Sequence, residues 1–168
     1  MGCIASFYLI DFADCEALAA SAEFVPKPRK FLGVIPRKII DYKDFFWKTL
    51  ETKAKELEEF QYSGWAFSHL FLMYPEFVNT SKSKLGERLT AAMGATYLSF
   101  TETEAHLALM VLGSNYPSSE TILEYFEAEG CPDEAKDWKV PIQASYDILK
   151  KWLSCVEKNK IGLLAMAF

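Results

Sequence analysis

The chain ends in the stretch Ile142–Phe168, whose sequence is IQASYDILKKWLSCVEKNKIGLLAMAF. In its first part apolar residues recur every three or four positions, which predicts a long amphipathic helix that begins after Pro141. Asn159 and Lys160 break this pattern, and the eight residues from Ile161 onward carry no charged side chain. A free apolar tail of this kind would aggregate, so we expect it to be buried as a strand in a sheet.

The best partner for this strand is the other uncharged apolar run, Cys3–Ile10, near the opposite end of the sequence. We therefore expect Cys3–Ile10 and Leu163–Phe168 to be strands of one small sheet. A chain of 168 residues is usually one domain with its own core. The sequence thus predicts a single α+β domain over residues 1–168, with about six helices covering the sheet.

Periodicity and capping signals predict the elements between the two terminal strands. Helices are expected over residues 15–21, 42–60, 62–74, 85–93, 101–113 and 120–129, and a short strand over 97–100. Thr101 and Glu104 have the spacing of a capping box at the start of the fifth of these helices.

Residues 24–40 differ in composition from the rest of the chain. They include three prolines and five basic side chains. The prolines exclude a regular helix, so the stretch is predicted to be an exposed, extended connection. The alternative is a docking strip for an acidic partner.

Overall charge and hydropathy exclude several classes of protein. The net charge of −5 disfavours nucleic acid as the main partner, because phosphate binding needs a concentrated cationic surface. No apolar stretch has the length of a membrane span, and no basic segment opens a secretory signal. We expect a cytoplasmic protein that does not act at a membrane.

The cysteines and the first six residues carry two further signals. The four cysteines are scattered, without a Cys-x-x-Cys pair, which favours reduced and mostly buried thiols.

The opening MGCIAS matches the pattern for myristoylation at Gly2, with Cys3 as an adjacent palmitoylation site. Because an apolar strand follows at once, we expect that neither residue carries a lipid.

No known catalytic motif occurs in the chain, and only two histidines are present. His69 lies among apolar residues and is predicted to be a hydrogen-bonded core histidine. The sequence predicts no catalytic set, no metal site and no cofactor. The alternative is a pocket around Trp65, His69 and Tyr97, which would make the protein a small enzyme or a ligand-binding domain.

Acidic residues are concentrated between Thr101 and Asp137, where nine carboxylates accompany a single lysine. We expect part of this region to form one negative surface that captures a basic protein partner. The residues predicted to bind are Glu102, Glu120, Glu124, Glu127 and Glu129, with Tyr116 and Tyr125 as aromatic anchors.

Several segments together resemble the YfbM-like family of small bacterial domains of unknown function. They are the start MGCIASFYLI, the segment GWAFSHLFL at Gly64–Leu72, the passage YLSFT at Tyr97–Thr101 and the end of the chain, Leu149–Phe168. The resemblance implies an α+β fold and a bacterial cytosol, and it brings no established reaction.

The leading functional hypothesis is therefore a non-catalytic binding protein. By analogy with small, divergent, acidic domains that act beside toxins, it would be an immunity-type inhibitor. A broad acidic surface without a cleft would favour this hypothesis. A closed pocket that holds His69 next to a charged neighbour would favour the alternative.

Overall fold

The computed structural model describes residues 2–25 and 42–167, which form one α+β domain. Most of the basic stretch 24–40 lies outside the described residues. The strands are β1 (Ile4–Asp11), β2 (Ala54–Glu56), β3 (Thr96–Phe100) and β4 (Lys160–Ala167). The α-helices are α1 (Cys15–Glu23), α2 (Tyr42–Lys53), α3 (Trp65–Met73), α4 (Pro75–Val78), α5 (Lys84–Met93), α6 (Glu102–Ser114), α7 (Ser119–Ala128) and α8 (Ala135–Ser154). Two short 3-10 turns, η1 (Phe12–Asp14) and η2 (Pro132–Glu134), precede α1 and α8.

The two terminal strands lie side by side at the centre of the sheet. The order is β2-β1-β4-β3, and every neighbouring pair is antiparallel. β1 pairs with β4 along its whole length, from Ile4 opposite Ala167 to Asp11 opposite Lys160. Every residue of β4 between its two ends is buried. The prediction that both termini are strands of one sheet is confirmed.

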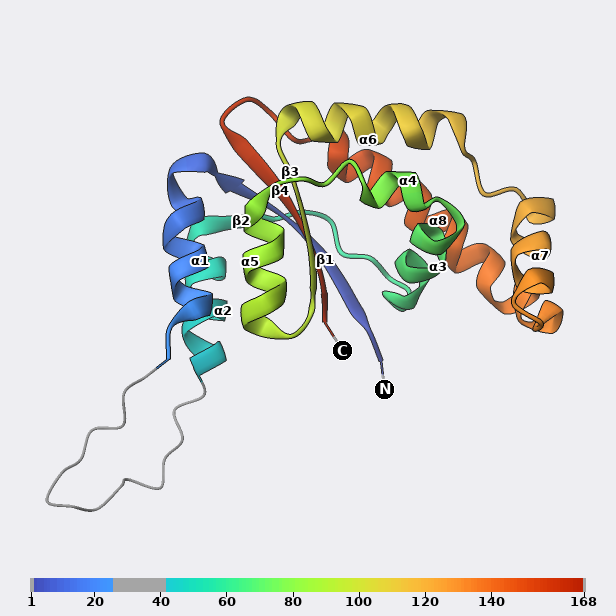
Figure 1. Ribbon diagram of the computed structural model, residues 1–168, viewed down its shortest axis with the longest axis horizontal. Coiled ribbons are helices and arrows are strands. Elements are labelled where there is room, and N and C mark those ends of the chain that lie inside the picture. Colours follow the sequence, from blue (N-terminus) through green and yellow to red (C-terminus); the bar gives the residue numbers. More distant parts are fainter. Residues whose placement is uncertain (1, 26–41, 168) are drawn as a thin grey trace, which may run out of the picture.

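Helices cover both faces of this sheet, as Figure 1 shows. On one face α1, α2 and α5 pack over Ile10, Tyr97 and Leu163, which belong to one apolar cluster. On the other face α3, α4, α6 and α8 pack over Phe7 and Leu164, which belong to a second cluster. The uncharged run of β4 is explained by this arrangement, because alternate side chains point into two different cores.

Most predicted helices are present with ends shifted by a few residues, and α4 is an additional short helix after Pro75. The capping box at α6 is confirmed. The Thr101 hydroxyl accepts from the Glu104 amide at 3.3 Å, and the Glu104 carboxylate accepts from the Thr101 amide at 2.8 Å. Both orphan donors at the start of α6 are thereby satisfied.

The prediction of one helix over residues 42–60 is wrong. The α2 helix ends at Lys53, and the next three residues form β2 beside β1. The Leu57 amide then donates to the Phe7 carbonyl at 2.9 Å, which extends this contact. Tertiary pairing overrides the local preference here, because without it the Phe7 carbonyl would lack a backbone donor.

The start predicted for the last helix is also wrong. α8 begins at Ala135, so that Pro141 lies inside it, and it ends at Ser154. A proline in a helix interior removes one backbone hydrogen bond and costs about 3 kcal/mol. Burial of Ala135 and the aromatic contacts of Trp138 hold the turns before the proline in place and offset this cost.

The free edge of β3 is closed by two side-chain hydroxyls. Thr90 accepts from the Tyr97 amide at 3.0 Å and donates to the carbonyl of the same residue at 3.3 Å. Ser81 does the same for Ser99, at 3.2 and 2.9 Å. The close approach of α5 needs Gly86, since a Cβ there would lie 2.8 Å from the Tyr97 carbonyl oxygen. This arrangement leaves no open edge on β3 at Tyr97 or Ser99 for another strand to pair with.

Substitution of Gly162, the third residue of β4, tests how tightly the sheet is covered. A Cβ at this position would lie 2.6 Å from carbon atoms of both Phe7 and Val156. We expect Gly162→Ala to lower the free energy of unfolding by about 1–3 kcal/mol through overpacking. Urea denaturation measures this change. The control is Gly113→Ala on α6, where the new methyl meets no atom within 4 Å and should stabilise by up to about 1 kcal/mol. Equal effects of the two substitutions would contradict the packing described.

Candidate functional site

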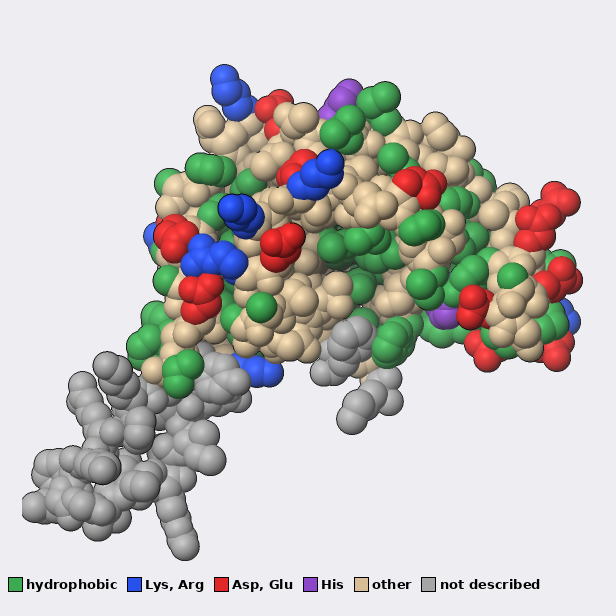
Figure 2. Space-filling model, in the orientation of Figure 1, with side chains coloured by type: hydrophobic (Ala, Val, Ile, Leu, Met, Phe, Trp, Pro, Cys, Tyr) green, Lys and Arg blue, Asp and Glu red, His purple; other side chains and the backbone are tan. Residues whose placement is uncertain are grey.

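The end of the molecule formed by α7, η2 and the first turn of α8 carries an acidic surface. We define it by seven exposed carboxylates, those of Glu120, Glu124, Glu127, Glu129, Asp133, Glu134 and Asp137. Lys136 is the only basic residue between Ser119 and Trp138. Figure 2 shows acidic side chains gathered at this end, over α7.

Five carboxylates elsewhere on the surface form ion pairs with cations. Arg88 binds both Glu16 and Glu23, at 2.8 and 2.7 Å, and ties α1 to α5. The remaining ion pairs join Lys53 to Asp14, Lys160 to Asp11 and Lys151 to Glu58. Among the residues that the structure describes, none of the seven carboxylates of the acidic surface forms an ion pair. Their charge is therefore not balanced by an ion pair within the described residues.

The sequence of α7 explains why its carboxylates face outward. Ser118 caps the helix by accepting from the Thr121 amide at 3.1 Å. Ile122 and Phe126, four residues apart, are buried against the protein. Glu120, Glu124 and Glu127 therefore lie along the opposite face of the helix.

Leu123 lies among these carboxylates and is 42% exposed. It is not among the binding residues predicted from the sequence. The available signal was its position, which is outside the stripe of Ile122 and Phe126 and next to Glu120, Glu124 and Glu127 in helical spacing. An exposed leucine surrounded by acids gives the acidic surface an apolar centre.

Glu102 does not belong to the acidic surface. It is the first residue of α6, a helix of 13 residues that leads away to the α7 end. At 1.5 Å per residue, the length of α6 places Glu102 about 20 Å from its far end. The predicted single surface therefore includes Glu120, Glu124, Glu127 and Glu129 but not Glu102.

The two tyrosines predicted as anchors have different surroundings. Tyr116 is 54% exposed and meets the ring of Tyr146 edge-on, with 5.2 Å between the ring centroids. Tyr125 is partly buried, and its hydroxyl lies 3.2 Å from Nδ1 of His69. Tyr116 is therefore exposed at the surface, whereas Tyr125 joins α7 to α3.

His69 is hydrogen-bonded, as predicted, but it is partly buried rather than fully inside the core. Besides Tyr125, its ring contacts Trp138 and Phe126, at centroid distances of 4.6 and 5.2 Å. Burial lowers the pKa of His69, while the carboxylates of Glu134 and Glu129 act in the opposite direction. These contacts give it a structural role between α3, α7 and α8.

The predicted pocket residues Trp65, His69 and Tyr97 do not come together. Trp65 and His69 are one turn apart on α3. Tyr97 is buried on the opposite face of the sheet, where it meets Phe46. Side chains of a β-strand alternate between its two faces, and no signal in the sequence indicated which face Tyr97 would take.

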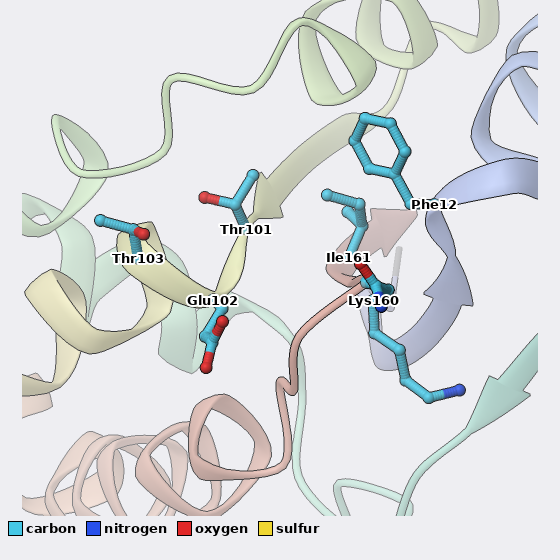
Figure 3. Close-up of a pocket in the computed structure, with 7 residues that line it drawn as sticks. Phe12, Thr101, Glu102, Thr103, Lys160 and Ile161 are labelled. Atoms are coloured by element: carbon cyan, nitrogen blue, oxygen red, sulfur yellow. The ribbon is translucent and has the colours of Figure 1, made fainter.

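Two cavities lie elsewhere, and His69 lines neither. The larger, of about 290 Å³, is bordered by Phe12, residues 101–103 at the start of α6, and residues 159–161 at the start of β4. In Figure 3 the side chain of Lys160 extends away from Glu102 and the two threonines. The smaller, of about 170 Å³, lies between α1 and the start of α5. Neither cavity is lined by a histidine.

Within the described ranges, no group of three or more His, Cys, Asp or Glu side chains is arranged to hold a metal ion. All four cysteines are free. Burial raises the pKa of Cys15 to about 11, helped by the carboxylates of Asp14 and Asp11, so this thiol is a poor nucleophile. Cys3 is buried, and its carbonyl accepts from the Gly64 amide at 2.8 Å, which joins the residue before β1 to the residue before α3. No helix in residues 2–25 or 42–167 has the length and apolar character needed to cross a bilayer.

Comparison with protein-family models, with curated proteins and with solved structures finds no match to this chain. The resemblance to the YfbM-like family therefore stays a prediction.

Substitution of Tyr97 tests whether its buried hydroxyl has a hydrogen-bond partner. It is buried without a hydrogen-bond partner among the described residues, and burial raises its pKa to about 12. We expect Tyr97→Phe to leave the free energy of unfolding unchanged or to raise it by up to about 1 kcal/mol. The control is Tyr146→Phe, which removes a bond of 2.7 Å to the Leu112 carbonyl and should cost about 1 kcal/mol. A larger loss for Tyr97→Phe in thermal or urea unfolding would show that this hydroxyl has a partner.

Proposed function

We propose that this protein is a non-catalytic binding protein that captures a basic protein partner through the acidic surface. The observation that supports it most is the concentration of seven exposed carboxylates over α7, η2 and the first turn of α8, where Lys136 is the one basic residue between Ser119 and Trp138. Acids on α1, β1 and the loop after β2 are held by Arg88, Lys160 and Lys151, whereas the seven carboxylates on α7, η2 and α8 have no ion-pair partner among the described residues.

Unpaired surface charge contributes more to the rate of association than to stability. Like charges held on one helix repel one another, and this repulsion is relieved when a cationic surface binds. A field of one sign raises association rates by about 10- to 1,000-fold, and salt screens it over about 10 Å at 0.1 M. An acidic surface of this kind suits rapid capture of a partner.

Leu123 and Tyr116 provide the apolar contacts that charge alone does not. Both are exposed, by 42% and 54%, and both border the acidic residues of α7 in the sequence. Interfaces concentrate binding energy in a few apolar or aromatic anchors inside a polar rim. The expected partner therefore presents lysine or arginine side chains around an apolar patch.

An immunity-type inhibitor is the form of this function that we favour, acting in a bacterial cytoplasm. A toxin that binds nucleic acid has a cationic surface, and an acidic protein would neutralise it by covering that surface. The resemblance to the YfbM-like family agrees with a bacterial source and adds no reaction. The alternative of a ligand pocket at Trp65, His69 and Tyr97 gains no support, because these residues lie on two faces of the sheet.

Charge reversal on α7 tests the proposal. The double variant Glu124→Lys/Glu127→Lys should lose a partner that wild-type protein retains in a pull-down from native lysate at about 50 mM salt. Raising the salt to about 500 mM should weaken the wild-type capture, because screening removes the long-range attraction.

The matched control is Glu87→Lys/Glu157→Lys, which changes the net charge equally at two exposed acids outside the acidic surface. This variant should retain the partner. Leu123→Ala should weaken capture at both salt concentrations, since its contribution is apolar. Equal retention by the α7 double variant and wild type would refute the role of this surface.

A further inference from the structure

The α7 helix lies at one end of the molecule, away from the sheet, in Figure 1. Its buried side chains are Ile122 and Phe126. The polar bond that joins it to α3 is the one between the Tyr125 hydroxyl and Nδ1 of His69, at 3.2 Å. His69 thus supplies a polar contact to α7, beside the buried side chains of that helix and the bond of 3.0 Å from Gln143 on α8 to the Pro117 carbonyl.

The surroundings of His69 are mostly uncharged. Trp138 from α8 and Phe126 from α7 contact the ring, and neither can compensate a full positive charge as water does. We call the contact of α7 with α3 and α8 around His69 the joint. The titratable groups that face His69 across it are Tyr125 and Glu129 at the end of α7, and Glu134 in η2. Cys131, which lies between Glu129 and Glu134 in the sequence, contributes to raising the pKa of Tyr125.

We propose that His69 is a pH-responsive clamp whose neutral form holds α7 against α3 and α8, and whose protonation loosens that attachment.

The protonation equilibrium of His69 decides how the attachment of α7 changes with pH. Burial lowers the pKa of His69 below its ordinary value of about 6.5, so the closed joint binds fewer protons than the opened one. The stabilisation is complete above the ordinary value. It is lost progressively as the pH falls from that value through the lowered pKa of the closed joint. Glu129 and Glu134 moderate the loss because their carboxylates favour the imidazolium.

A consequence for binding rests on the proposed function. A cationic partner that pairs with Glu129 and Glu134 removes the two charges that favour protonation of His69. Partner binding and proton uptake then oppose each other, so capture should weaken on acidification through the range in which His69 titrates.

Hydrogen exchange on the free protein tests the clamp without any partner. Backbone amides of α7 and α8 are compared at about pH 5.5 and pH 7.5, after correction for the intrinsic exchange rate, in the range where the imidazole titrates. On acidification we expect α7 to lose protection several-fold more than α8 in wild-type protein.

The chain has only two histidines, which supplies a matched control. His106→Gln removes the exposed imidazole on α6 and should behave as wild type. His69→Phe keeps a ring in the joint but cannot titrate, so α7 protection should no longer depend on pH. His69→Gln serves the same purpose if the phenylalanine is not accommodated.

Two results would overturn the clamp. One is an equal loss of protection in wild type and in the His69 variants. The other is a His69 signal that titrates at or above its ordinary pKa in an NMR titration, with the two histidines assigned from the variants. Both readouts are independent of the pull-down, so the clamp can fail while partner capture holds, and the reverse.

Discussion

The structure depends on the antiparallel pairing of β1 with β4. These strands come from opposite ends of the described chain, and each of the eight residues of β1 has a partner on β4. Together they separate two apolar clusters, one under α1, α2 and α5 and one under α3, α4, α6 and α8. Without this pair of strands, the helices of each cluster would have no sheet to pack against. Closing a loop of nearly the whole chain is costly in entropy, so burial on both faces has to offset it.

The distribution of charge follows from this arrangement. Near the sheet, cations hold elements in position, as Arg88 does by binding Glu16 and Glu23 across α1 and α5. The α7 end has no such role in the sheet and keeps its carboxylates unpaired among the described residues. Exposed ion pairs contribute little stability, so the protein loses little by leaving these acids unpaired. What they add is a negative field at this end of the molecule.

The sequence was sufficient where local signals and burial agreed. The uncharged run of β4 required two covered faces, and the capping box located the start of α6. Sequence reasoning failed where distant contacts decided the outcome. Residues 54–56 have helical spacing, yet β1 recruits them as a strand. Pro141 reads as a helix boundary, yet the contacts of Ala135 and Trp138 carry the helix past it. The acidic composition of α7 was visible, but the separation of Glu102 from it required the length and direction of α6.

Native-state hydrogen exchange at increasing denaturant tests the central claim most directly. If the β1–β4 pair supports both clusters, the amides at the centre of β4 should exchange only by global unfolding. Protected amides of α5 on one face and α8 on the other should then converge on the same free energy and the same denaturant dependence. Exchange of β1 and β4 while α8 or α5 remains protected would contradict the claim, because it would show that one cluster stands without the terminal pair.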